Sequence, residues 1–357
     1  MRRERGFTLI ESMISTALVL VIMGSLYMMI IFYRNLSHSE QSRVRLQQES
    51  RFLLSSLAAD LKNAGSVLTL AHTGGYLAGT AAFNGIYPIN NTAYPDGVIL
   101  ASGDPDAAAK LFAPYDPSSD GNTINVDDIS VATGADPWAL DDFGVIVGPN
   151  GYYVFRVASV TGNSIVKRTE SVYHSGLLAT ANYTDPETVK GDSVSYPQNA
   201  PVIRLTSFGI YLVQQVWDGT LGRSRRDLIR VVDCHGVADV LAAGAAVDRY
   251  VIADNMWDIQ LVYRTYPDFP DVTTKRVYFE IGSSLTHDDL LADIRAKVLK
   301  EVELNLIGLT SEFSGLGEVT HTVSDIGDHA GTTLPTGKYM YRQYRLTIEP
   351  RNFNIKL

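Results

Sequence analysis

Few side chains in this sequence are placed to do chemistry. No nucleophile elbow, phosphate-binding loop, HExxH pattern or zinc-ligand spacing occurs along the 357 residues. The only cysteine, Cys234, excludes an intramolecular disulfide. It is followed by His235 and invites a reactive-thiol or metal reading, but a small buried residue after the strand-like DLIRVVD is the favoured interpretation. We therefore expect a non-catalytic protein, not an enzyme.

A polar loop from Asp116 to Asp128 partly matches a twelve-residue calcium loop. It lacks the bidentate glutamate, and no helical pattern flanks it, so a polar hairpin is favoured and calcium is a weak alternative. No other cofactor is expected. The side chains that would supply oxygen ligands are Asp116, Ser118, Asp120, Asn122 and Asp127, with Gly121 at the turn.

Three further groups of residues have both a functional interpretation and a simpler structural one. His321 and His329, with Asp325 and Asp328 between them, could hold a metal, but their Gly/Asp-rich surroundings favour a surface loop. The basic cluster RSRR is interpreted as a solvated turn, although a small local basic patch remains possible. The tyrosines of an irregular segment could form a binding surface, but isolated surface tyrosines are commoner. The residues concerned are Arg223, Arg225 and Arg226 in the cluster, and Tyr76, Tyr87, Tyr94 and Tyr115 in the segment.

The most unusual titratable group is Glu11, the only charged residue between Phe7 and Phe32. A helix over that stretch is about 39 Å long, enough to cross a bilayer core of about 30 Å. A carboxylate in such a helix is costly and calls for a partner. No A-x-A-like site follows the stretch, so an ordinary signal peptide does not explain it.

The residues Gly6-Phe7-Thr8-Leu9-Ile10-Glu11 resemble the cleavage signature of type IV prepilins and type II secretion pseudopilins. The resemblance implies that prepilin peptidase cuts after Gly6, which ends a leader at 1–6, and methylates the new N-terminal Phe7. The arginines of the leader would hold it in the cytoplasm. Pairing of Glu11 with the Phe7 amine of a neighbouring subunit would satisfy both charges and fix the axial register of the subunits.

The apolar half of the helix, 7–33, runs on into an amphipathic half, 34–65. Leu46, Leu53, Leu57 and Leu61 recur at helical spacing, and charged residues occupy the other faces. Gly65 fits a left-handed helix stop. The sequence predicts one continuous helix over 7–65, whose leucine stripe packs under a globular domain.

Residues 66–357 predict a β-rich periplasmic or extracellular domain, so the fold class is α+β: a pilin-like long helix packed against antiparallel sheets. Residues 66–125 are expected to form a long loop region with short strands such as 98–100. From about 123 the β signal dominates, with tight hairpins at Asn150-Gly151 and Asp218-Gly219 and a short helix over 287–300. The strand candidates are 123–131, 143–147, 152–160, 164–169, 202–214, 227–232, 256–263, 276–281, 301–309 and 339–348.

The charge is unevenly distributed. Residues 1–64 hold eight Lys/Arg and five acidic residues, a net charge of +3. Because the whole chain has a net charge of −9, residues 66–357 carry a net charge of −12. An acidic domain disfavours nucleic-acid binding.

The C-terminal half narrows the resemblance. The segments 251–263, 300–312 and 344–352 are similar to segments of minor pilins of the PilW type, the last closing with Arg351-Asn352. The resemblance implies a subunit of a small complex with other minor and major pilins that primes pilus assembly, ends at the pilus tip and holds an adhesin. Before assembly the chain would sit in the bacterial inner membrane as a single-pass protein with a cytoplasmic N-terminus.

Two other classes stay open. A minor pseudopilin of a type II secretion system would have the same architecture. A tip adhesin or DNA-uptake subunit would use the 66–125 segment for binding.

Overall fold

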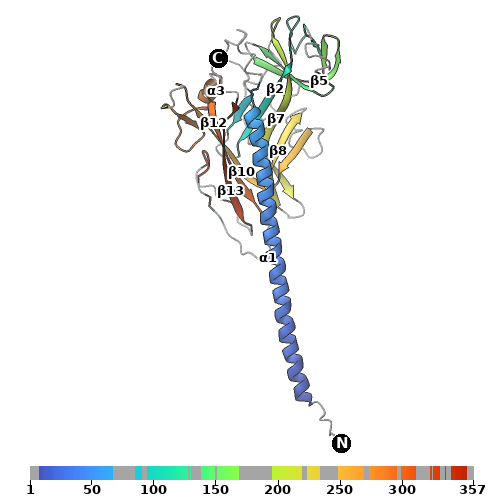
Figure 1. Ribbon diagram of the computed structural model, residues 1–357, viewed down its shortest axis with the longest axis vertical. Coiled ribbons are helices and arrows are strands. Elements are labelled where there is room, and N and C mark those ends of the chain that lie inside the picture. The colour runs from blue at the N-terminus through green and yellow to red at the C-terminus, as the bar shows by residue number, and fades with distance from the viewer. Residues whose placement is uncertain are drawn as a thin grey trace.

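The protein was analysed as a computed structural model (Figure 1). The structure describes residues 8–66, 85–90, 95–127, 129, 138–148, 151–168, 195–218, 223–233, 248–268, 273–295, 299–310, 322–323, 325–329, 334 and 339–351.

One helix, α1 (Leu9–Asn63), runs through most of the length of the molecule and confirms the predicted continuous helix (Figure 1). Thr8 is its N-cap, and Ala64 is its C-cap, whose N–H donates to the Asp60 carbonyl. Gly65 has a φ of 76°, the left-handed conformation expected of a residue just past a helix end. The predicted leucine stripe, Leu46, Leu53, Leu57 and Leu61, is buried.

The larger sheet has nine strands in the order β1-β2-β7-β4-β5-β6-β3, and a branch from β7 continues through β8 to β9. All its described pairs are antiparallel. Its strands are β1 (Ile86–Ile89), β2 (Gly97–Lys110), β3 (Thr123–Asn125), β4 (Phe143–Gly148), β5 (Gly151–Thr161), β6 (Ser164–Lys167), β7 (Pro201–Asp218), β8 (Arg223–Asp233) and β9 (Asp248–Ala253).

The smaller sheet has four antiparallel strands in the order β11-β10-β12-β13. A short helix, α3 (His287–Arg295), precedes β12. The strands are β10 (Met256–Thr265), β11 (Arg276–Tyr278), β12 (Leu299–Leu309) and β13 (Tyr341–Ile348). The antiparallel α+β fold predicted from the sequence is confirmed.

The upper half of α1 lies between the two sheets (Figure 1). It contacts β2 and β9 of the larger sheet and β12 and β13 of the smaller one. Its leucines share one hydrophobic core with side chains from both sheets. Asp96 joins the sheets directly, because its N–H donates to the Ile259 carbonyl (2.9 Å) and its Oδ2 accepts from the Leu261 N–H (2.8 Å).

A second core lies where β3, β5 and β6 meet, around Tyr153, Phe155 and Tyr196. Figure 1 places β5 at the end of the molecule farthest from the N-terminus. A third, smaller cluster packs Val323, Ile326 and Leu334 against β12.

The prediction of a long loop region over 66–125 with short strands such as 98–100 is wrong for β2, which extends over 14 residues. β2 is a long strand that pairs with both β1 and β7. The sequence pattern failed because β2 contains Gly, Asp, Pro and four alanines, all residues that strands use sparingly. Burial against α1 and β7 outweighs those propensities.

The basic cluster is not a solvated turn, because Arg223, Arg225 and Arg226 belong to β8. The smaller differences concern element ends. β3 is only three residues long and β11 likewise, while β7 extends to Asp218 and α3 ends at Arg295. The β4–β5 and β7–β8 hairpins are present, with Gly148 opposite Gly151 and Asp218 opposite Arg223; their connecting residues, 149–150 and 219–222, lie outside the described residues.

Candidate processing and assembly site

The N-terminal end of α1 is closed by a capping box between Thr8 and Glu11. The Thr8 Oγ1 accepts from the Glu11 N–H at 3.4 Å, and Glu11 Oε2 accepts from the Thr8 N–H at 3.1 Å and from its hydroxyl at 3.0 Å. Such reciprocal bonds satisfy helix N–H groups that have no partner one turn back. The box therefore fixes the carboxylate at the first turn of the helix.

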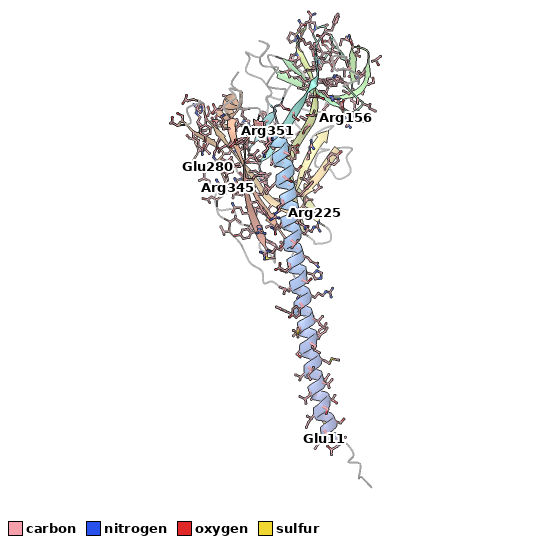
Figure 2. All side chains as sticks on the ribbon, viewed as in Figure 1. Glu11, Arg156, Arg225, Glu280, Arg345 and Arg351 are labelled. Carbon is pink, nitrogen blue, oxygen red and sulfur yellow. The ribbon has the colours of Figure 1, made fainter. Side chains whose placement is uncertain are left out.

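Glu11 lies at the free end of an apolar rod (Figure 2). α1 is the one helix of the described residues long and apolar enough to cross a membrane, and its most apolar window is not buried by the rest of the chain. Side chains such as Leu9, Val21 and Met28 are 70–79% exposed. No ion pair of Glu11 occurs within the part of the chain that the structure describes. This surface can be covered only by lipid or by other protein chains.

Several predicted site residues lie outside the described residues. They are the cleavage and methylation positions Gly6 and Phe7, the pair Cys234 and His235, the histidine His321, and the tyrosines Tyr76 and Tyr94.

The predicted calcium loop is a tight turn held by its own side chains. Asp116 Oδ1 accepts from the N–H and the hydroxyl of Ser118 at 2.8 and 2.6 Å, and Asp120 Oδ2 accepts from the Asp116 N–H at 2.7 Å. The Ser118 bonds lower the pKa of Asp116. Asp127 instead binds the Lys110 N–H at 2.9 Å.

The loop carboxylates are thus already engaged by the protein's own donors. The backbone carbonyl of Asn122 accepts from the Lys167 N–H. Within the described ranges no cluster of three or more His, Cys, Asp or Glu could hold a metal ion. Calcium binding stays a prediction, which a calcium-dependent rise in melting temperature would support.

His329 is placed against β10 and not in an open surface loop. Its Nδ1 lies 2.8 Å from Asp258 Oδ2, and both side chains are largely buried. Asp328 accepts from the Asn90 amide at 3.1 Å. The pair formed by His329 and Asp258 holds the segment 325–329 to the smaller sheet. No local pattern indicates this pair, because 71 positions of the chain separate its members.

Two arginines of the basic cluster, Arg225 and Arg226, are engaged with neighbouring groups. Arg225 Nε is 3.0 Å from Asp227 Oδ2, and the Arg226 guanidinium lies 4.1 Å from the centre of the Trp257 ring. Burial raises the pKa of Asp227, and the nearby Arg225 opposes that rise. Tyr87 and Tyr115 are buried, at 8% and 3% exposure, so neither offers a binding surface.

Sequence reasoning missed an ionic cluster around the buried carboxylate of Glu303, on the outer face of the smaller sheet. Glu303 on β12 accepts from Arg264 on β10 at 2.5 Å and from Arg345 on β13 at 2.6–2.7 Å. The strict alternation of charged and apolar residues in β12 marked Glu303 as facing away from the leucines. It did not show that Glu303 itself is buried, nor that the two arginines come from neighbouring strands.

A second missed cluster surrounds Asp293 of α3. It accepts from the hydroxyls of Thr265 and Tyr278 at 2.5 and 2.6 Å, and from Arg276 at 3.1 Å. Burial and the Asp293 carboxylate raise the pKa of Tyr278 to about 12. These bonds fix the short helix to β10 and β11, so the cluster has a structural role.

Comparison with known proteins bears on the N-terminus. The family described as the prokaryotic N-terminal methylation motif matches residues 1–27. No curated protein and no solved structure matches the chain. Together with the apolar helix that begins within it, the motif supports a type IV pilin or pseudopilin that prepilin peptidase processes. Such a protein is anchored in the inner membrane and assembles with other pilins. Such proteins are structural and non-catalytic.

Proposed function

We propose that this chain is a minor pilin of the PilW type. It takes part in the complex that initiates assembly of a type IV pilus, together with other minor pilins and major pilins, and it stays at the pilus tip, where it holds an adhesin.

The observation that carries the proposal is the arrangement of the three segments that resemble PilW-type minor pilins. The segment 251–263 runs from β9 in the larger sheet into β10, 300–309 forms β12, and 344–348 belongs to β13. β10, β12 and β13 are adjacent, and they pack with α1 in one core. Segments far apart in the sequence thus build one of the two sheet surfaces that hold the assembly helix, which supports a shared architecture and not a chance likeness.

The processing step that we propose uses residues at the tip of α1. Prepilin peptidase cuts between Gly6 and Phe7 and methylates Phe7. The Phe7 ammonium of one subunit then pairs with Glu11 of its neighbour when both enter the apolar core of the filament. Thr8 holds Glu11 at the first turn until that partner arrives. Mass spectrometry of the native N-terminus, with methyl-Phe7 as the expected first residue, tests this step.

Gene deletion separates a pilus role from a secretion role. A minor pilin predicts that cells without this chain lose surface pili in electron micrographs and still export their type II secreted enzymes. Normal piliation with lost export would contradict the proposal and favour a pseudopilin. Complementation with the intact gene controls for effects on neighbouring genes.

A further inference from the structure

Three buried side-chain oxygens that can only accept hydrogen bonds have no donor, and their residues meet at one place. They are Asn90 Oδ1, Gln260 Oε1 and Asp328 Oδ1. No other buried carboxylate or amide oxygen lacks a hydrogen-bond partner in the part of the chain that the structure describes. Buried acceptors almost always have a partner, so three exceptions in one place need a common explanation.

The three residues come from different parts of the fold. Asn90 directly follows β1 of the larger sheet, Gln260 belongs to β10 of the smaller sheet, and Asp328 lies between β12 and β13. Asn90 Nδ2 donates to Asp328 Oδ2 at 3.1 Å, so the second oxygens of both side chains flank that bond.

Gly327 brings the same turn against Gln260. The turn is closed by reciprocal backbone bonds between Ile326 and His329, of 3.1 and 2.9 Å. A Cβ on Gly327 would lie 2.8 Å from Gln260 Cβ and 3.0 Å from Gln260 Oε1. The backbone beside Asp328 therefore packs directly on the Gln260 side chain, and the turn contacts both Asn90 and Gln260.

The orientation of the Gln260 amide is fixed by its neighbours. Gln260 is 0% exposed, and its Nε2 donates to Asp258 Oδ1 at 3.2 Å and lies 3.3 Å from His329 Nε2. A reversed amide would place its oxygen against the Asp258 carboxylate, an unfavourable contact between two acceptors. Oε1 is thereby directed to the turn and away from Asp258.

The surroundings of the three oxygens carry uncompensated negative charge. Asp258 is 1% exposed, and its partners are the Gln260 amide and His329, whose Nε2 faces an N–H donor and so accepts as a neutral imidazole. Asp328 is bonded to the Asn90 amide. Within the described ranges no lysine or arginine pairs with either carboxylate. A buried carboxylate in this setting is stabilised by a cation.

From these observations we propose that Asn90 Oδ1, Gln260 Oε1 and Asp328 Oδ1 bind one calcium ion, with water as further ligands. We call these three residues the 90–260–328 site. Carboxylate and amide oxygens are calcium ligands, whereas magnesium keeps most of its water and zinc prefers nitrogen and sulfur. The ion joins β1, β10 and the β12–β13 connection, and so ties together the two sheets that hold α1.

The 90–260–328 site differs from both metal sites considered from the sequence. It uses no imidazole nitrogen, since His329 is engaged with Asp258 and Gln260. It is also separate from the loop that begins at Asp116. It goes beyond the proposed function and does not depend on it, because any role outside the cytoplasm exposes this domain to calcium.

Thermal melting of the full chain in micelles of a neutral detergent tests the proposal. We compare calcium chloride with magnesium chloride, each at about 10 mM, and with a chelator alone. Extracellular calcium sites have dissociation constants of about 0.1–1 mM, so calcium should raise the melting temperature by about 3–5 °C. Magnesium should raise it much less.

Asp328→Asn assigns the calcium effect to the 90–260–328 site. The new side chain still offers an oxygen to the Asn90 amide, and it replaces a buried charge with an N–H donor. Without calcium this variant should melt at or above the temperature of the native chain, and the rise with calcium should disappear. The matched control, Asp116→Asn, should keep the full rise.

Asn90→Asp should change both measurements in the opposite direction. It places a second carboxylate against Asp328, so the chain without calcium should melt at a lower temperature than the native chain. The added negative ligand should enlarge the rise with calcium. A residue with a purely structural role would lower both melting temperatures equally.

Several results overturn the inference. They are no rise of the native chain with calcium, an equal rise with magnesium, a rise that persists in Asp328→Asn, and a rise that disappears in Asp116→Asn. Asp328→Asn that melts well below the native chain in the chelator, or Asn90→Asp without a larger calcium response, would also contradict it. Methyl-Phe7 and piliation are measured separately, so a failed calcium site leaves the proposed function standing.

Discussion

The two halves of α1 use their apolar side chains differently. From Leu9 to Tyr33 they are exposed around the whole circumference, whereas from Leu46 to Leu61 one leucine stripe is almost completely buried and Phe52, which lies outside that stripe, is exposed. Figure 2 shows the first half projecting away from the globular domain and ending at Glu11. The difference teaches that the first half is built for contacts outside the chain and the second for contacts within it.

The comparison predicts that changes in the free half alter assembly without altering the fold. Glu11→Ala should still be inserted in the membrane, but its incorporation into filaments should fall at least about a hundredfold, because the neighbour's Phe7 ammonium loses its partner in an apolar environment. Quantitative immunoblotting of sheared filaments measures this. Glu40→Ala, on the exposed part of the same helix, is the control, and normal incorporation of Glu11→Ala would refute the pairing.

Substitutions in the buried half should instead lower the stability of the fold. Leu57→Ala removes a side chain that is 1% exposed and should lower the free energy of unfolding by about 2–5 kcal/mol. Denaturation of the full chain in detergent micelles, followed by near-ultraviolet circular dichroism, measures the loss. Leu20→Ala, which is 68% exposed, should change it by less than about 0.5 kcal/mol. Equal effects of the two substitutions would abolish the distinction between the halves.

The sheet that holds the buried half should also respond to acid. Burial alone would raise the pKa of Glu303, but hydrogen bonds from Arg345, Arg264 and Asn305 hold that pKa below its ordinary value of 4.5. A carboxyl whose pKa is lowered in the folded state stabilises the fold at higher pH, and that stability is lost as the pH falls below about 4.5. Melting temperatures from pH 7 to pH 3 should therefore fall more steeply for the native chain than for Glu303→Gln. Parallel curves for the two chains would contradict the prediction.

A matched pair of glycines provides the mildest test. A Cβ on Gly308 would lie 2.7 Å from Leu46 Cδ1, so Gly308→Ala should destabilise the contact between β12 and α1 by about 1–3 kcal/mol. A Cβ on Gly24 would meet nothing within 4 Å, so Gly24→Ala should strengthen the helix by about 1 kcal/mol. Opposite shifts of the melting temperature are expected, and shifts of the same sign would contradict the comparison.

Most of the helix could be predicted from the sequence, because local signals specify it. The capping residues Thr8 and Glu11, the uninterrupted apolar run, the leucine spacing and Gly65 all act within a few residues of one another. The β-domain was predicted in part. Strands with strong alternation, such as β12, were found, but β2 beyond 98–100 was missed since its composition opposes its conformation and only its neighbours hold it extended.

The candidate sites divide in the same way. The sequence by itself determined the membrane-spanning rod, its isolated carboxylate and the leader before it, since charge and hydropathy along one helix are local properties. Only the tertiary structure decided that Glu303 meets arginines from two other strands and that Asp258 holds His329. These arrangements depend on strand order and register, which are set by contacts between residues far apart in the chain.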